Sequence, residues 1–459
     1  MAFTTLWLTA CGGGGGGGDT PAAAPSPLPA ATGSPPPASA PLPPNAAPSA
    51  SAPGPTASAE FMVNTTTAGD QRFSAMARLN DGGHVVVWLS DLTQPGLSSN
   101  RSICKQRYGV DGAAAGAETC VGSPDPTPTP GPAVAALSDG GYVVAWATEG
   151  DVRLTSSVIR TQRYDVSGSA VGGVQQANEN AGLLNDVQAA AVAGGGYVLN
   201  WKRLTQDAGF IALRRFGTDG LPAGPEQTMN TGFNYNPRIA ALDGGGYVIV
   251  RSDSSRAVGR DLPILATRYD NQFAQVGPEI TVSDIGGFEQ DTRVINLAGG
   301  GFAIGWRDSV SGEVRVQRFA SDGSRAGTPV PGDSPVPIVS CIGRVAPPGV
   351  PCPAFQGEVA LAGLEDGGYV ATWTADFTQI QTGSRTATVF ARRFAANGSA
   401  AGPVVQVSSR SNLSGLVAPS IAALPSGSVA ITWGVGGQTF QDIFERRLDA
   451  RSLLGGTTP

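Results

Sequence analysis

The chain has 459 residues, a net charge of −6 and only 14% charged residues. An acidic chain with two lysines and no basic cluster lacks the positive surface that nucleic acids require, so the composition argues against a nucleic-acid partner. The single histidine, His84, excludes multi-histidine metal centres and leaves a serine–histidine–aspartate triad only one possible base.

The first eleven residues end in Leu8-Thr9-Ala10-Cys11, which resembles the lipobox of bacterial lipoproteins. In that class the cysteine is lipidated and becomes the mature N-terminus. The apolar stretch before Cys11 is short and carries no Lys or Arg, so we expect the translation start to lie upstream. The resemblance implies a lipid anchor on Cys11, and Gly12, where inner-membrane lipoproteins carry aspartate, favours the outer membrane. The alternative is a free cysteine at a disordered end.

Residues 12–59 are glycine, then a run of Pro, Ala, Ser and Gly with almost no charge. Such a segment cannot bury enough apolar surface to offset chain entropy, so it is predicted to be a disordered, semi-extended tether. A tether of this kind holds a folded domain away from a membrane. No later stretch approaches 18 consecutive apolar residues, so no membrane-spanning helix is expected.

From residue 60 the chain repeats one motif. Its first part is a short apolar strand A, a glycine turn and a second apolar strand B that ends in Trp, as in DGGYVVAW; the copies are 75–88, 133–146, 189–201, 238–251, 293–306, 359–373 and 420–433. The second part is a strand C; the copies are 105–112, 161–168, 213–220, 266–273, 316–323, 391–398 and 445–452. A strand D is clearest at 224–230, 277–283 and 402–408. The β-branched and aromatic runs between glycine turns predict four antiparallel strands per unit.

Seven such units average about 57 residues, which is near the length of propeller blades. The seventh unit has no strand D after its strand C, whereas residues 59–65 (AEFMVNT) resemble one ahead of the first unit. The sequence therefore predicts an all-β, seven-bladed β-propeller over residues 60–456. Its ring is expected to close through residues 60–64, the outermost strand of the last blade, antiparallel to the strand near 442–449. An open solenoid has no need of this arrangement. The alanine-rich A strands should lie nearest the axis.

These features together resemble tandem repeats of the form GGYVVxW…QRYDxxGxxxGxExxVN in large bacterial surface and secreted proteins. The resemblance covers about residues 60–456 and implies an extracytoplasmic β-repeat domain. It carries over no catalytic residues.

Lipidation of Cys11 leaves four of the five cysteines, and four cysteines allow three disulfide pairings. The local pairings are Cys104–Cys120 and Cys341–Cys352. Cys104 on strand C and Cys120 on strand D lie an equal number of steps from the turn near residue 112, so they should lie opposite each other. Disulfides fit an exported protein.

The sequence shows no phosphate loop, no Cys-x-x-Cys site and no calcium-loop spacing, so we predict no cofactor and no metal site. His84 takes a position that is Tyr or Phe in other copies and is expected to be a half-buried strand residue. Every C strand carries an arginine, which we expect to pair with turn acids or pack on aromatics rather than bind an anion; these are Arg107, Arg163, Arg215, Arg268, Arg318, Arg393 and Arg447. Units four and seven, which lack the Trp and the glycine pair respectively, should be the least regular.

The A–B and C–D turns are short, whereas the B–C and D–A connections are long and irregular. One face of the ring is therefore plain and the other elaborated, and function on a rigid scaffold tends to lie in such loops. The candidate ligand-binding residues pair aromatics with polar groups at two adjacent junctions, where they could border one pocket; they are Phe233, Asn234, Tyr235, Phe288, Glu289 and Asp291. Ordinary loop packing is the alternative.

With no catalytic signature, the sequence favours a binding module over an enzyme. The predicted function is a monomeric, lipid-anchored propeller of the cell envelope that binds a glycan or protein on its loop face. One alternative is a structural or assembly lipoprotein of the outer membrane, which should expose an apolar patch. Another is a propeller polysaccharide lyase or glycosidase, which should show convergent Glu, Asp or Tyr side chains at the axis.

Overall fold

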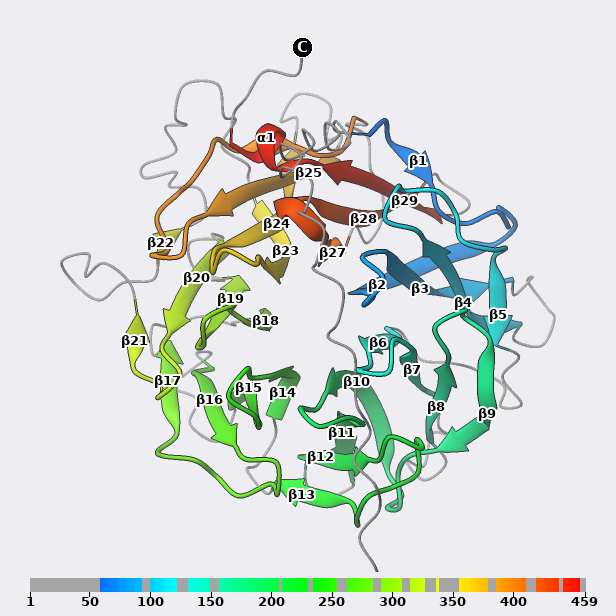
Figure 1. The fold of residues 1–459 in the computed structure, drawn as a ribbon, viewed down its shortest axis with the longest axis vertical. Helices are drawn as coiled ribbons and strands as arrows, with labels where there is room; N and C mark the ends of the chain where they lie inside the picture. Colours follow the sequence, from blue (N-terminus) through cyan, green and yellow to red (C-terminus); the bar gives the residue numbers. More distant parts are fainter. Residues whose placement is uncertain are drawn as a thin grey trace, which may run out of the picture. The chain divides into compact units, whose positions relative to one another are not determined.

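The computed structural model describes residues 58–92, 100–121, 131–148, 157–205, 209–229, 234–253, 262–283, 290–307, 314–326, 336–337, 355–378, 385–409, 418–436 and 441–454. These residues form seven antiparallel sheets, which follow one another along the chain (Figure 1).

Each of the first six sheets starts with an inner strand and adds the next strands outward in sequence order. Blade one contains β2 (Asp70–Arg78), β3 (His84–Asp91), β4 (Arg101–Tyr108) and β5 (Thr119–Val121). Blade two contains β6 (Ala133–Ala136), β7 (Tyr142–Ala147), β8 (Ile159–Tyr164) and β9 (Ala170–Gln176). Blade three contains β10 (Leu183–Ala191), β11 (Tyr197–Leu204), β12 (Gly209–Phe216) and β13 (Gln227–Met229). Blade four contains β14 (Asn234–Ala241), β15 (Tyr247–Asp253), β16 (Ile264–Tyr269) and β17 (Ile280–Ser283).

The remaining blades depart slightly from this plan. Blade five contains β18 (Gln290–Asn296), β19 (Phe302–Arg307), β20 (Val314–Phe319) and β21 (Arg325–Ala326), and β22 (Val336–Pro337) also pairs with β20. Blade six contains β23 (Phe355–Gly363), β24 (Tyr369–Thr378), β25 (Arg385–Phe394) and β26 (Val405–Gln406). Blade seven contains β27 (Ser420–Ala423), β28 (Val429–Gly436), β29 (Gln441–Leu448) and, as its outer strand, β1 (Phe61–Met62). The short helix α1 (Ala450–Leu453) follows β29.

The seven inner strands form a closed circuit. Each inner strand contacts the inner strand of the next blade, and β27 of the last blade contacts β2 of the first. Figure 1 shows these strands around the centre of the ring, with the short fourth strands on its perimeter. The prediction of a seven-bladed β-propeller with the alanine-rich strands at the axis is confirmed.

The repeated Asp-Gly-Gly-aromatic motif has a steric origin, which blade one illustrates. Gly82 has a φ of 83°, which costs other residues strain. A Cβ on the next residue, Gly83, would collide with the carbonyl oxygen of Tyr108, and the Gly83 amide donates to the Asp81 carboxylate at 2.9 Å. The turn before the second strand can approach the end of the third strand only where it has no side chain. This is why each unit repeats nearly the same residues at this turn.

The second strand of each blade is buried between its neighbours, as a propeller requires. All eight residues of β3 are buried, for example. The Trp that ends this strand is fully buried in six blades. In blade four Arg251 takes this place, is 2% exposed and pairs with Glu279.

Blade four keeps the four-strand order, and Arg251 pairs with Glu279, but a register shift between Ile264 and Leu265 makes its outer edge irregular. Blade five, with its split outer edge, departs more. In blade seven the glycine pair is replaced by a 3-10 turn, Pro425–Gly427, in which Ser426 has a φ of 62°.

The ring closes through the N-terminal strand, as predicted. β1 runs antiparallel to β29, with Phe61 opposite Glu445 and Met62 opposite Phe444. The Val63 amide extends this ladder by donating to the Ile443 carbonyl at 2.8 Å.

Side chains around β1 repeat the contacts of an internal fourth strand. The Asn64 carboxamide oxygen accepts the Ile443 amide proton at 2.7 Å, and Asn178 accepts that of Ile159 in blade two at 2.9 Å. The VN ending of the repeat therefore serves to cap the third strand, and residues 60–64 carry the sequence of a true strand D.

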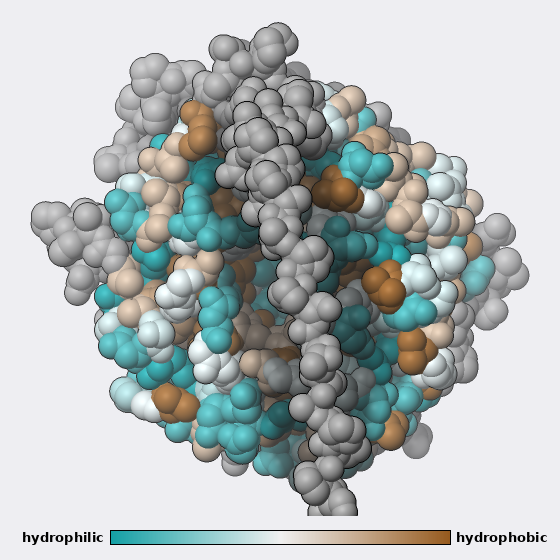
Figure 2. All heavy atoms as spheres, viewed as in Figure 1, coloured by the Kyte–Doolittle hydropathy of each residue, from teal (hydrophilic) through white to brown (hydrophobic). Residues whose placement is uncertain are grey.

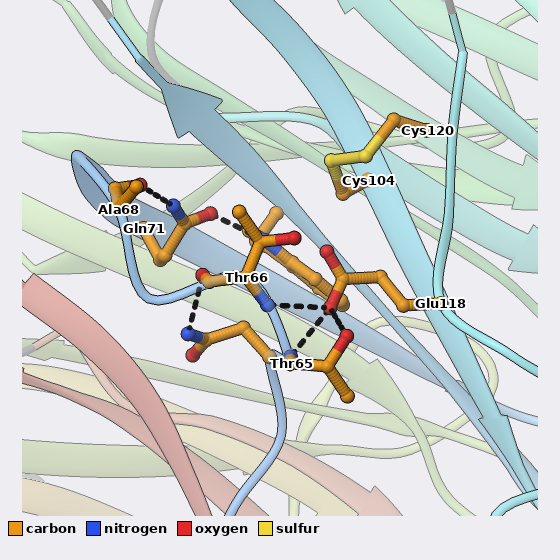
Figure 3. Close-up of a disulfide and its surroundings, with 9 residues drawn as sticks. Thr65, Thr66, Ala68, Gln71, Cys104, Glu118 and Cys120 are labelled. Carbon is orange, nitrogen blue, oxygen red and sulfur yellow. Dashed lines mark hydrogen bonds between the residues drawn. A yellow bond between two sulfur atoms is a disulfide. The ribbon is translucent and has the colours of Figure 1, made fainter.

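A disulfide in blade one lies beside this closure (Figure 3). Cys104 of β4 and Cys120 of β5 are direct register partners with their Cα atoms 3.9 Å apart, so this predicted pairing is confirmed. The neighbouring Glu118 carboxylate accepts hydrogen bonds from the Thr65 amide, the Thr65 hydroxyl (2.7 Å) and the Thr66 amide (3.3 Å). Blade one thus holds the chain that leaves β1. Cys341, Cys352 and Cys11 lie outside the described residues, so the Cys341–Cys352 pairing stays a prediction.

A chain that starts at residue 66 should melt at a clearly lower temperature than one that starts at residue 58, because it lacks the outer strand of blade seven. Asn64→Ala should cost about 1–3 kcal/mol, since it leaves the buried Ile443 amide without an acceptor. Asn45→Ala, in the predicted tether, is the matched control and should cost nothing. The melting temperatures of all four proteins are measured, and equal values for the two truncated chains would show that β1 does not stabilise the closed ring.

Candidate functional site

A cavity of about 410 Å³ lies among the seven inner strands. Every blade contributes to its wall, through its inner strand or the residues directly before that strand. Its volume falls within the range of small-molecule binding sites. We call this space the axial cavity.

The inner strands carry a β-bulge at the level of this cavity. Register shifts interrupt five of them; they lie between Arg72 and Ala75, Asn185 and Gln188, Tyr235 and Arg238, Gln290 and Arg293, and Gln356 and Val359. A bulge re-aims the side chains around it and is common beside functional sites.

Two of these bulges hold strained backbone. Phe73 has a φ of 56° and Asp186 a φ of 54°, and both line the axial cavity. They occupy equivalent positions, two residues before Ala75 and Gln188, which pair with equivalent residues of the second strand. A left-handed conformation costs a residue with a β-carbon roughly 1–2 kcal/mol, so something other than local preference maintains it.

Two arginines project from neighbouring blades into the axial cavity. Arg238 of β14 and Arg293 of β18 occupy equivalent register positions on inner strands that contact each other. Each guanidinium donates to the carbonyl of its preceding residue, Arg238 to Pro237 at 3.1 Å and Arg293 to Thr292 at 2.9 Å. The two side chains therefore adopt the same arrangement, held by their own backbone.

Carboxylates flank this arginine pair. Glu358 of blade six lies 3.8 Å from the Arg293 guanidinium, and Asp186 of blade three lies on the other side of blade four. Burial lowers the pKa of Lys202, and the nearby Asp186 carboxylate opposes this shift. Among the described side chains of the cavity wall, two guanidiniums thus face two carboxylates, and the formal charges cancel.

Blade three adds one amide, Gln188, to the polar side, and a second amide lies beside it on the next strand. Gln188 lines the cavity, and Asn200 is its direct register partner on β11. Asn200 is fully buried, and neither atom of its amide has a hydrogen-bond partner among the described residues. Such a group is unusual and calls for an explanation such as an unseen ligand or water.

The opposite side of the cavity is uncharged. Blades one, two and seven line it with Phe73, Ser74, Met76, residues 131–134 and residues 418–421. Phe73 is the aromatic residue of this wall. The axial cavity therefore has a polar crescent, formed by Asp186, Gln188, Arg238, Arg293 and Glu358, that faces a wall of small and apolar groups.

The candidate residues named from the loops fall next to this crescent. Asn234 and Tyr235 begin β14, just before Arg238, and Asp291 lies in β18, two residues before Arg293. The structure brings the backbones of these two segments onto adjacent inner strands. Phe233, Phe288 and Glu289 lie outside the described residues, as do the side chains of the other three.

Sequence reasoning missed the crescent itself. A signal was present, because Arg238 and Arg293 take the position that is Ala75 in the first unit and Ala133 in the second. Inner strands of a propeller are expected to serve packing, and this hides the signal.

The arginines of the third strands do not form an anion site. Arg107 pairs with Asp81 at 3.0 Å and Arg163 with Asp139 at 2.7 Å, so the expected pairing with turn acids is confirmed there. Each also packs on the next blade: a Cβ on Gly168 would meet Arg107 Cδ at 2.8 Å. These arginines join neighbouring blades away from the axial cavity.

His84 belongs to the ring closure rather than to a site. It is fully buried, with Nε2 3.0 Å from a Glu445 carboxylate oxygen and Nδ1 3.3 Å from the Arg447 guanidinium. Its ring stacks on Tyr108 at 5.0 Å. It is more deeply buried than expected, because blade seven covers it with a complementary ion pair.

The fold defines the protein as a seven-bladed β-propeller. No family model matches the chain, and no curated protein sequence matches it. A structure of a protein of unknown function from Dyadobacter fermentans aligns over 87% of this chain and 100% of its own, with 12% identity and a TM-score of 0.50.

More distant structures include a prolyl endopeptidase and a sialidase. The endopeptidase aligns over 86% of this chain and 48% of its own, with 14% identity and a TM-score of 0.43. The NanB sialidase from Streptococcus pneumoniae aligns over 86% and 70%, with 9% identity and a TM-score of 0.40. The chain thus spans about half the length of the endopeptidase, and at these identities the likeness concerns the fold alone.

If the strain at Asp186 serves the cavity rather than the fold, relieving it should stabilise the protein. Asp186→Gly and Asp186→Ala both remove the carboxylate, but only glycine relieves the positive φ. We expect the free energy of unfolding of Asp186→Gly, measured with denaturant, to exceed that of Asp186→Ala by about 1 kcal/mol. Equal stability, or a more stable alanine variant, would show that the bulge is not strained.

Proposed function

We propose that this protein is a lipid-anchored binding module of the cell envelope, and that its propeller binds a small polar ligand in the axial cavity. The observation that carries this proposal is the polar crescent, whose Gln188, Arg238 and Arg293 occupy inner-strand positions that are alanine in blades one and two. The fold does not require those charges.

The blades themselves provide the comparison. Gln188, Arg238 and Arg293 pair with the residue just before the Trp position, and so do Ala75 and Ala133 in blades one and two. Small residues therefore suffice for packing at this level of the axis. The polar side chains on consecutive blades are therefore not needed for packing at this level, which favours a role in binding.

The alternatives fit less well. A scaffold should present an apolar patch, but on the face that Figure 2 shows the apolar residues of the described chain are scattered among polar ones. Several exposed large apolar residues of the described chain, including Val110, Val166 and Leu221, lie singly in separate turns. An enzyme remains the second candidate, because Asp186 and Glu358 supply the two axial carboxylates that a glycosidase would need.

The anchor rests on the sequence. Leu8-Thr9-Ala10-Cys11 and the tether of residues 12–59 support attachment to a membrane by lipid, and the Cys104–Cys120 disulfide is compatible with export. In the part of the chain that the structure describes, there is no helix long and apolar enough to cross a membrane.

Lipidation is tested by expression from the full gene in a Gram-negative host. The protein should partition into detergent and take up labelled palmitate, and Cys11→Ala should abolish labelling and release soluble protein. Cys341→Ala is a matched control that should keep the label. Undiminished labelling of Cys11→Ala would refute the anchor.

Ligand binding is tested by incubating the detergent-solubilised full chain with the small-molecule fraction of an envelope extract and identifying retained compounds by mass spectrometry. Ala189→Phe, which fills the axial cavity, should lose the retained compound, whereas Ala170→Phe on the exposed outer strand β9 should keep it. If both variants retain the compound, or if the unmodified protein retains none, the axial site is contradicted. Recovery of a cleaved compound would favour the enzyme.

A further inference from the structure

We infer that the ligand of the axial cavity is a neutral saccharide of one or two sugar rings. This inference rests on the proposed function and adds to it the chemical class of the ligand. Three properties of its described side chains support it: their charge balance, the arrangement of their donors and acceptors, and the aromatic ring of Phe73 in the opposite wall.

The charge balance disfavours a charged ligand. Around the axis the polar crescent runs from Asp186 through Arg238 and Arg293 to Glu358. An anion bound to the arginines would also face both carboxylates, and a cation bound to the carboxylates would also face both arginines. In a partly buried site, repulsion between the ligand's charge and the like-charged groups of the wall offsets much of the attraction to the opposite charges.

Hydroxyl groups match this crescent. Guanidinium groups only donate hydrogen bonds and carboxylates only accept them, whereas a hydroxyl does both. A ligand with hydroxyls on consecutive carbons can therefore accept from Arg238 and Arg293 and donate to Asp186 and Glu358 at the same time. Hydrogen bonds to charged groups are stronger than those between neutral groups, so a neutral ligand can still bind usefully.

The uncharged wall suits the other face of a sugar ring. One face of many pyranose rings presents C–H groups rather than hydroxyls, and it packs well on an aromatic side chain. Phe73 lies in the wall opposite the crescent, in the strained bulge that aims it at the cavity. The space of about 410 Å³ limits the ligand to a small molecule or to one end of a chain.

The experiment compares sugars that differ mainly in charge. Isothermal titration calorimetry of the detergent-solubilised full chain would use glucose, galactose, N-acetylglucosamine, lactose and N,N′-diacetylchitobiose as neutral probes. Glucuronate and glucosamine are matched charged probes, and glutamine is a net-neutral zwitterion that tests paired charges. At least one neutral probe should bind about tenfold more tightly than every charged probe, since each buried charge mismatch weakens binding.

Two variants locate the binding. Arg293→Gln and Glu358→Gln keep the side-chain size and should each weaken binding of that neutral probe by about tenfold or more, because each removes a charge-assisted hydrogen bond. Arg325→Gln, on the outer edge of the same blade as Arg293, is the matched control and should leave the affinity unchanged.

Failure of this inference can be told apart from failure of the proposed function. If no neutral probe binds, or if a charged probe binds as tightly, the saccharide class is overturned. If the extract experiment nevertheless yields a retained compound that Ala189→Phe loses, axial binding stands and the ligand is of another class. If both experiments fail, the proposed function falls with the inference.

Discussion

The pairing of β1 with β29 is the contact on which the rest of the structure depends. It joins chain segments almost 400 residues apart, as in the bond from the Ile443 amide to Asn64. Seven blades meet at one axis only if the ring is closed, and the inner strands then contact each other on both sides. His84 of blade one and its buried partners Glu445 and Arg447 of blade seven lie where these two blades meet. The ring is thus closed by backbone pairing between β1 and β29, and the neighbouring contact between blades seven and one adds a complementary set of buried polar groups.

Closure determines what the inner strands can be. Where seven strands converge, large side chains on every blade would not fit, so alanine dominates and the glycine turns repeat. The same crowding makes each exception informative. Arg251 and the third-strand arginines are exceptions explained by partners on their own or neighbouring blades. Arg238 and Arg293 differ because they lie at the axis, in the position that is alanine in blades one and two.

Most of the fold could be predicted from the sequence, because it depends on local rules repeated seven times. Strand periodicity, glycine turns and the misplaced strand D predicted the blades, the closure and the Cys104–Cys120 pairing. The axial cavity could not be predicted in the same way. Its wall depends on bulges that shift the register by one residue, and the residues around Phe73 and Asp186 carry no sequence mark of a bulge. The loop candidates near Tyr235 lie on the two blades that carry Arg238 and Arg293, and their role in binding stays a prediction.

The asymmetry of the ring bears on how a repeat protein acquires a site. Equivalent positions in all blades share one backbone environment, so a change in one blade leaves the others to hold the fold. Blades three to six carry charged or amide groups at the axis, while blades one, two and seven keep small residues beside Phe73. The closing contact lies within blade seven, between β29 and β1, so the polar crescent on blades three to six is built away from it. Strain placed there, as at Asp186, is separated from the contact that keeps the ring closed, whereas the strain at Phe73 lies in blade one beside it.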